Sequence, residues 1–386
     1  MRGPETRAHD GDGDEHGGAA MLGAMPSQQS PDRDLTDALP DTMLAAVTTH
    51  HGGLDAIAVH EVPVPTPGPG EVLVRVAAAG CNNTDIWTRE GSYGSGTGPD
   101  AKAGWLGPLD FPRIQGGDVA GTVVAAGSRQ GAALVGTRVL VDPALYGDDG
   151  PDALPTDVLG SERDGGFAEY VVAPAARVHD VGDSPLDDEQ LAALPIAYGT
   201  ALGMLERGGV REGHTVVVTG ASGGVGLAAV QLASARGARV VAVCSGDKAD
   251  AVRAAGADEV VDRSRGQVAA DLARLAPEGY DAAVDVIAGE VLEAGVGLMR
   301  PGGRWVVAGA LGGWEVRLDV RRLYLADISL VGSTMHTPRI FDLLVGVARQ
   351  GAVAPVVAAR YPLAEVVEAQ RQLERREHVG KIVVVP

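Results

Sequence analysis

The feature that most constrains this chain is a glycine-rich turn between an apolar run and a helical pattern. The run TVVVTG (215–220) leads into GASGGVG (220–226), and a stretch with apolar residues at helical spacing follows. Gly223 lets the backbone turn tightly, and Gly226 lets the new helix pack closely on the strand. A helix N-terminus offers unpaired N–H groups and a positive dipole end, which suit a phosphate. In this context an empty tight turn is the lesser alternative, and the sequence predicts a dinucleotide site at Gly220, Ala221, Ser222, Gly223, Gly224, Val225 and Gly226.

The segments around this turn predict the fold class. After about residue 194, apolar runs alternate with helical patterns, which indicates a parallel sheet with helices on both faces. Before it, short apolar runs such as EVLVRVAAAG are broken by Gly and Pro, which is typical of a strand-rich domain. The last segment, from Tyr361, adds a helix and a strand that can return to the first domain. We therefore expect an α/β protein with a doubly wound parallel sheet in 195–337 and a strand-rich catalytic domain in 42–194, completed by 338–386.

The first 41 residues form a polar tail. They contain nine acids and three bases with few apolar residues, so we expect this segment to be disordered. It lacks the apolar stretch of a secretory signal, and Met43, which opens the first apolar strand, is an alternative start.

Charge and composition exclude several classes of function. The formal net charge is −19, which disfavours nucleic acid as a partner. Apolar runs are too short to span a membrane. Two cysteines, Cys81 and Cys244, cannot form a disulfide framework or a four-thiolate zinc site. We therefore expect a cytoplasmic protein that acts on a small molecule.

The end of the second strand of the α/β segment favours one cofactor over another. NAD-selective sites place Asp or Glu there to hold the ribose hydroxyls, whereas this strand ends in Cys244 and Ser245. Ser245 and Lys248 suit a 2′-phosphate, and Arg263, after the third strand, is a second candidate cation. Lys248 and Arg263 could also be ordinary surface side chains. The missing carboxylate is the stronger signal, and it predicts NADPH.

Several motifs in order resemble those of a known family. AAAGCNNTDIWTREGSYG, PRIQGGDVAGTVVAAG, RDGGFAEYVVAP, ALPIAYGTAL, GASGGVGLAAVQLA and HVGKIVVVP span roughly residues 43–386. Together they resemble the zinc-free quinone oxidoreductase and enoyl reductase branch of the medium-chain dehydrogenase/reductase superfamily. The resemblance implies a GroES-like catalytic domain, a Rossmann-type cofactor domain and a homodimer.

The same resemblance bears on metal chemistry. Zinc alcohol dehydrogenases of this superfamily hold their metal with Cys, His and Cys, and the matching places here carry Asn82, Gly117 and Ile196. None of these side chains is a zinc ligand, and the cysteine-rich structural zinc lobe is absent from the sequence. We therefore expect no metal.

Without a metal, hydrogen-bond donors must stabilise charge that develops on the substrate oxygen. Asn82 can donate through its amide, and Tyr93 matches the position from which related enoyl thioester reductases present a tyrosine. Asp85 falls in the family's Asn-x-x-Asp pattern and could orient Asn82. Thr200 matches a residue beside the nicotinamide, although a helix-capping role is equally compatible. His336 could face the cleft as a proton donor, but a lone histidine is more often structural.

These expectations lead to one main hypothesis and two alternatives. The main one is a zinc-independent, NADPH-dependent reductase that acts on a conjugated carbon–carbon double bond, in an enone or enoyl thioester, or on a quinone. The first alternative is a zinc-independent carbonyl or alcohol oxidoreductase. The second is a cofactor-binding protein of the same fold without catalytic activity.

Overall fold

A parallel sheet forms the centre of the segment that carries the glycine-rich turn. Every neighbouring pair in it is parallel. Its strand order is β13 (Glu259–Asp262), β12 (Arg239–Cys244), β11 (Thr215–Val218), β14 (Tyr280–Asp285), β15 (Met299–Val307) and β16 (Ser329–Gly332). Its central strands are continuous Val and Ala runs because both faces are covered.

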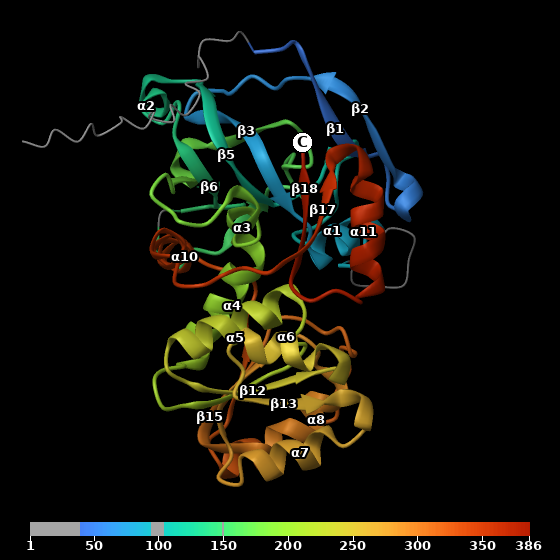
Figure 1. Ribbon diagram of the computed structural model, residues 1–386, viewed down its shortest axis with the longest axis vertical. Helices are drawn as coiled ribbons and strands as arrows, with labels where there is room; N and C mark the ends of the chain where they lie inside the picture. The colour runs from blue at the N-terminus through green and yellow to red at the C-terminus, as the bar shows by residue number, and fades with distance from the viewer. Residues whose placement is uncertain (1–38, 94–103, 149) are drawn as a thin grey trace, which may run out of the picture. The chain divides into compact units, whose positions relative to one another are not determined.

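Successive residues of β11 show how the two faces are covered. Val216 and Val218 pack in one core with α4 (Pro195–Gly208), α5 (Gly224–Ala235) and α10 (Pro338–Gln350), while Val217 packs in another with α7 (Val268–Leu275) and α8 (Gly289–Gly295). This alternation follows from the two-residue period of a strand. In Figure 1, α5 and α7 lie on opposite sides of the yellow and orange strands. The predicted doubly wound sheet is confirmed. The remaining helices of this segment are α6 (Ala249–Ala254) and α9 (Val320–Leu325).

A largely antiparallel sheet joins the early part of the chain to its end. Its strand order is β10 (Val178–Asp180), β6 (Arg138–Val141), β5 (Asp118–Ala126), β3 (Glu71–Gly80), β18 (Lys381–Val385) and β17 (Val357–Pro362), with β9 (Tyr170–Pro174) also paired to β3. The pairs Val383 with Gly80 and Val384 with Ala79 place the last strand against an early one. Figure 1 shows red β17, β18 and α11 (Val366–Arg375) with the blue and green strands. The predicted strand-rich domain is confirmed, and the last strand of the chain pairs with it.

Residues 39–93, 104–148 and 150–386 are described in this computed structural model. Nearly all of the tail and most of the Gly-rich loop after Tyr93 lie outside them. Within them, no helix has the length and apolar character needed to cross a membrane.

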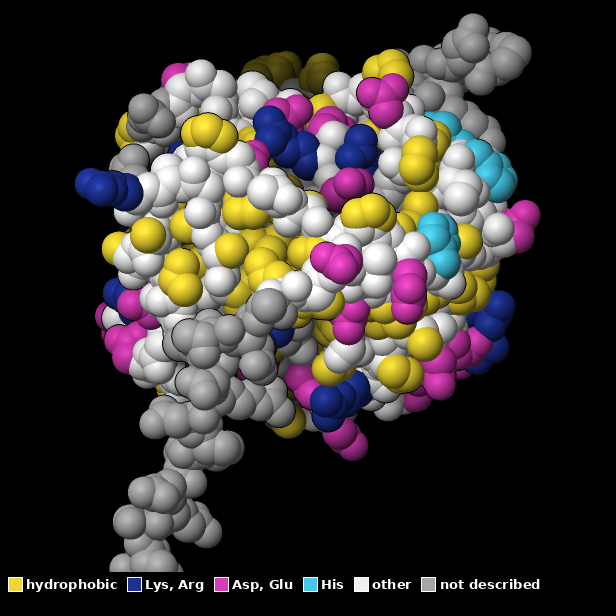
Figure 2. All heavy atoms as spheres, turned by 90° about the horizontal axis from the view of Figure 1, so that it is seen from above, with side chains coloured by type: hydrophobic (Ala, Val, Ile, Leu, Met, Phe, Trp, Pro, Cys, Tyr) yellow, Lys and Arg dark blue, Asp and Glu magenta, His cyan; other side chains and the backbone are white. Residues whose placement is uncertain are grey.

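The face shown in Figure 2 carries acidic, basic and hydrophobic side chains in a mixed arrangement, so it has no electrostatic field of one sign. Smaller elements are β1 (Thr42–Thr48), β2 (Ile57–Pro63), β4 (Arg113–Ile114), β7 (Ala144–Tyr146), β8 (Pro155–Val158), α1 (Asn83–Glu90), α2 (Arg129–Ala132) and α3 (Asp188–Ala192).

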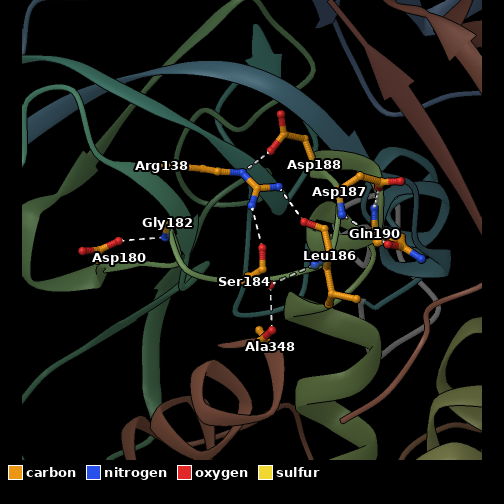
Figure 3. Close-up of polar contacts among 9 residues, drawn as sticks. All are labelled: Arg138, Asp180, Gly182, Ser184, Leu186, Asp187, Asp188, Gln190 and Ala348. Carbon is orange, nitrogen blue, oxygen red and sulfur yellow. Dashed lines mark hydrogen bonds and ion pairs between the residues drawn. The ribbon is translucent and has the colours of Figure 1, made fainter. Parts of the chain in front are cut away.

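Arg138 holds residues 181–194, the segment that connects β10 to α4 and so links the two sheets (Figure 3). From β6, its guanidinium donates to Asp188 Oδ1 at 2.6 Å and to the Leu186 carbonyl oxygen at 2.8 Å. The Ser184 hydroxyl donates to the Ala348 carbonyl oxygen of α10 at 2.7 Å. The connection is therefore tied to the strand-rich domain on one side and to α10 on the other.

Candidate cofactor and active site

The glycine-rich turn opens a large cavity of about 1330 Å³. Gly220, Ser222, Gly223, Gly224, Val225 and Gly226 line it, while Ala221 is buried in the core behind. Gly220 has φ +58°, and a Cβ at Gly226 would lie 2.2 Å from the Gly220 carbonyl oxygen, so the turn requires glycine at both. The first N–H groups of α5 have no partner within the helix and are available to an anion. The turn therefore fits a dinucleotide pyrophosphate.

The cavity continues past the end of β12, where Ser245, Lys248 and Arg263 line it. The Lys248 ammonium donates to the Arg376 carbonyl oxygen at 2.6 Å, at the C-terminal end of α11. Arg376 lines the same cavity. The structure thus brings Ser245, Lys248 and Arg263 to one cavity and adds a third cation, on Arg376, that no sequence pattern indicates. Arg376 sits in a charged stretch, RQLERRE, where nothing distinguishes it from its surface neighbours.

The carboxylate of Asp262 contacts the loop after Ser245. Hydrogen bonds from the Ser264 side chain and backbone, and from the Gly246 N–H, lower the pKa of half-buried Asp262. A Cβ at Gly246 would lie 2.5 Å from Asp262 Oδ2. Asp262 therefore holds the loop after Ser245 in place.

At the other end, three side chains from distant segments form a buried network. Asn82 precedes α1, Asp118 opens β5 and Lys381 opens β18. Lys381 Nζ lies 2.6 Å from Asn82 Oδ1, 2.9 Å from Asp118 Oδ2 and 2.7 Å from the Cys81 carbonyl oxygen. Asn82 Nδ2 donates to Asp118 Oδ2 at 2.8 Å and to the Gly80 carbonyl oxygen at 3.4 Å.

This network decides what Asn82 can do. An ammonium only donates, so Lys381 turns the amide oxygen of Asn82 toward itself and the amide nitrogen toward Asp118. Both amide protons are then used within the protein. The predicted donation from Asn82 to a substrate would require one of these hydrogen bonds to break, so we propose that Asn82 has a positioning role.

The places that match zinc ligands in related dehydrogenases lie together here. A Cβ at Gly117 would be 2.8 Å from Ile196 Cδ1, so the isoleucine side chain occupies the space beside that glycine. The Ile196 N–H donates to Asp118 Oδ1 at 2.7 Å. In the described part of the chain, no group of three or more His, Cys, Asp or Glu side chains is placed to hold a metal ion.

Asp85 caps α1 rather than lining the cavity. Its Oδ2 accepts the Asn82 N–H at 2.7 Å, which with the Asn82 side chain forms a capping box. Burial raises the pKa of Asp85 to about 7. The residue acts through the start of the helix that carries Asn83 and Thr84 into the cavity wall.

Tyr93, Thr200 and several apolar side chains also line the cavity. The Tyr93 ring meets Trp87 edge-on, with ring centroids 5.4 Å apart. Burial raises the pKa of Tyr93 to about 12, so its hydroxyl keeps its proton at neutral pH. Thr200 reaches the cavity from α4. The apolar wall consists of Trp87, Trp105, Val158, Ile196 and Met335.

His336 does not line the cavity. Its side chain is fully buried, and its Nε2 lies 2.8 Å from Asp142 Oδ1. The three residues before it, Ser333, Thr334 and Met335, line the cavity instead. His336 therefore cannot reach a substrate directly as a proton donor.

Two family models match the chain. One, described as an alcohol dehydrogenase GroES-like domain, covers residues 68–183. The other, described as a zinc-binding dehydrogenase, covers residues 224–348.

Curated relatives and solved structures match most of the chain. The synaptic vesicle membrane protein VAT-1 homolog of Rattus norvegicus is 28% identical, and the match covers 88% of this chain and 83% of the relative. Human quinone oxidoreductase is 28% identical, with 86% of this chain and 94% of the relative covered.

Among solved structures, a putative alcohol dehydrogenase from Sinorhizobium meliloti 1021 superposes with a TM-score of 0.86 at 42% identity, covering 91% of this chain and 99% of the other. A 2-octenoyl-CoA carboxylase reductase solved with NADP and 2-octenoyl-CoA gives a TM-score of 0.79 at 29% identity, covering 91% of this chain and 89% of the other.

Proposed function

This chain belongs to the medium-chain dehydrogenase/reductase superfamily of oxidoreductases, and we propose that it is a zinc-independent, NADPH-dependent reductase of conjugated carbon–carbon double bonds or quinones. The observation that carries this proposal is the Lys381 ammonium on Asn82 Oδ1, with Ile196 beside Gly117, at the places of zinc ligands in related dehydrogenases. Relatives named quinone oxidoreductase and 2-octenoyl-CoA carboxylase reductase support the substrate class.

The chemistry requires a donor for the acceptor's oxygen. When bound, the reduced nicotinamide supplies a hydride to the acceptor. Attack on a conjugated alkene leaves an enolate, and the protonated hydroxyl of Tyr93 can donate a hydrogen bond to its oxygen. A proton from the Tyr93 hydroxyl or from solvent then adds to the carbon next to the carbonyl and completes the saturated product. The Thr84 and Thr200 hydroxyls, which also line the cavity, can complete the polar contacts. Asn82 and Lys381 are themselves part of the cavity wall, and their contacts with buried Asp118 hold them in place.

Product analysis with an α,β-unsaturated ketone and NADPH tests this chemistry. We expect the saturated ketone. An allylic alcohol would show carbonyl reduction and overturn the proposal in favour of a carbonyl reductase. Absence of turnover with enones and quinones, together with tight NADPH binding, would favour a cofactor-binding protein.

Three cations, on Lys248, Arg263 and Arg376, support NADPH over NADH, and the NADP complex of a relative agrees. Losing one charge-assisted contact costs about 1.5–3 kcal/mol, so Arg263→Ala should weaken NADPH about ten-fold or more and leave NADH nearly unchanged. Lys248→Ala should act in the same direction. Arg265→Ala, on the same 3-10 turn but outside the cavity lining, is the matched control. A wild-type preference for NADH would contradict the cofactor proposal.

Zinc independence has a direct test. We expect elemental analysis of the purified protein to give no stoichiometric zinc, and chelators to leave turnover unchanged. One tightly held zinc per chain that is lost together with activity would contradict it.

A homodimer is the assembly we propose. Strand β16 is the last of the parallel sheet, and Leu330 on it is exposed. Nearby in sequence, exposed apolar side chains gather on and before α9: Trp314, Val320, Tyr324 and Leu325. A self-pairing edge strand covered by such side chains would form a two-fold interface. Light scattering should give twice the chain mass, and Leu330→Lys should give monomers; a monomeric wild type would refute this.

A further inference from the structure

The segment that links β16 to α10 forms part of the acceptor wall. Its residues Ser333, Thr334 and Met335 line the cavity. The Met335 side chain packs with Ala144 and Val158. Its backbone has φ +22°, a conformation that residues other than glycine rarely adopt and that the surroundings must hold.

Asp142 and His336 hold this segment from the side of the strand-rich domain. His336 Nε2 donates to Asp142 Oδ1 at 2.8 Å, and both side chains are fully buried. Asp142 follows β6 and is itself fixed, because it accepts the Ala144 N–H at 3.0 Å and the Tyr146 hydroxyl at 3.3 Å. The pair therefore attaches His336, the residue next to Met335, to the segment that follows β6.

Helix α4 packs against the same segment. A Cβ at Gly199 would lie 2.5 Å from His336 Nδ1, and a Cβ at Gly203 would lie 3.0 Å from the Met335 carbonyl oxygen. These two glycines, one helical turn apart, leave room for the imidazole and the backbone beside it. At the other end, Arg207 donates to the Ser333 hydroxyl at 3.2 Å. Met335 is thus fixed from both sides.

We propose that Asp142 and His336 are a positioning pair that holds Met335 in the acceptor wall and so sets the affinity for the acceptor. The inference rests on the proposed function in one respect, namely that this end of the cavity takes the acceptor. The pyrophosphate turn lies between β11 and α5, outside these contacts, so we expect loss of the pair to change NADPH affinity little.

Kinetics with purified full-length variants test the pair. His336→Leu should raise the KM for menadione, a naphthoquinone acceptor, about ten-fold, while the Kd for NADPH stays within two-fold. His336→Gln keeps an N–H donor and should restore most of the KM. Phe341→Leu is the control, because the buried Phe341 ring packs against the imidazole, with ring centroids 4.8 Å apart, and forms no hydrogen bond with it. This variant should lower the melting temperature and leave the KM for menadione unchanged.

A second readout needs neither acceptor nor turnover. Met335 is buried, so hydrogen peroxide should oxidise it slowly in the wild type, as followed by mass spectrometry. His336→Leu should speed its oxidation several-fold, His336→Gln should not, and Phe341→Leu should not. Unchanged oxidation in His336→Leu, or equal weakening of NADPH and menadione, would overturn the positioning role. Faster oxidation in a protein that reduces no acceptor would support the pair and refute only the proposed function.

Discussion

Replacing Lys381 by Met removes the one cation inside the buried network of Asn82, Asp118 and Lys381. Met has a similar length and no charge, so packing changes little. The Lys381 side chain is 4% exposed and that of Asp118 is 0%, and the ammonium donates to three oxygens within 2.9 Å. Without it, the carboxylate stays buried with only the Asn82 amide and the Ile196 N–H as donors.

The expected magnitude follows from this environment. Breaking a buried ion pair by removing one partner costs about 3–5 kcal/mol, because the remaining charge is left uncompensated. An exposed pair contributes far less, so Arg253→Met, which breaks the surface pair with Asp250, should cost under about 1 kcal/mol. The double variant Asp118→Asn with Lys381→Met should be less destabilised than Lys381→Met alone, since it carries no orphaned charge while Asn can still accept the Ile196 N–H.

Urea denaturation followed by circular dichroism measures all three variants, with NADPH affinity as a check on the native cavity. The reasoning would be refuted if Lys381→Met lost no more stability than Arg253→Met. It would equally be refuted if the double variant were less stable than the single one, since the carboxylate would then not be the source of the cost.

Three further predictions follow from individual contacts. Tyr93→Phe should lower turnover of an enone about 10²–10³-fold with NADPH affinity unchanged, as steady-state kinetics and fluorescence titration would show; equal turnover would exclude the hydroxyl. Burial raises the pKa of Asp85 to about 7, so the folded protein holds this proton more tightly than the unfolded chain does, and the resulting stability is present below about pH 4 and is lost as the pH rises through 7. Asp85→Asn should therefore gain stability relative to the wild type between pH 5 and 8 in parallel melting curves. A difference that stays constant with pH would contradict this. Arg138→Lys should lower the free energy of unfolding by about 1–3 kcal/mol, because a single ammonium cannot match the guanidinium's contacts with Asp188 and the Leu186 carbonyl; a neutral change would show that the contacts in Figure 3 are dispensable.

The sequence was sufficient for the fold because its signals are local. Apolar runs such as TVVVTG, the turn at Gly223 and Gly226, and the helical spacing that follows are readable within a dozen residues. The return of the last strand was also readable, since an apolar run at the chain end needs a sheet to join.

The role of Asn82 was not readable in this way. Whether its amide faces a substrate depends on Lys381, which lies 299 positions away in sequence. One signal was available, because a lysine that opens the apolar strand KIVVV is expensive to bury without a partner. The identity of that partner, Asp118, becomes clear only from the sheet topology, in which β18 and β5 pair with opposite sides of β3.

The network also bears on the proposed zinc independence, because Asn82, Gly117 and Ile196 are linked through it. Ile196 fills the space beside Gly117, and a larger side chain at 117 would meet Ile196 Cδ1 at 2.8 Å and the Leu159 carbonyl oxygen at 2.9 Å. Asn82 supplies an oxygen to Lys381 Nζ at 2.6 Å, which places a positive charge where the amide oxygen points. A divalent cation near that oxygen would meet the ammonium's like charge in a buried setting, where such repulsion is poorly screened. Restoring one ligand would therefore leave the clash with Ile196 or the charge of Lys381 in place, so these residues act as a set.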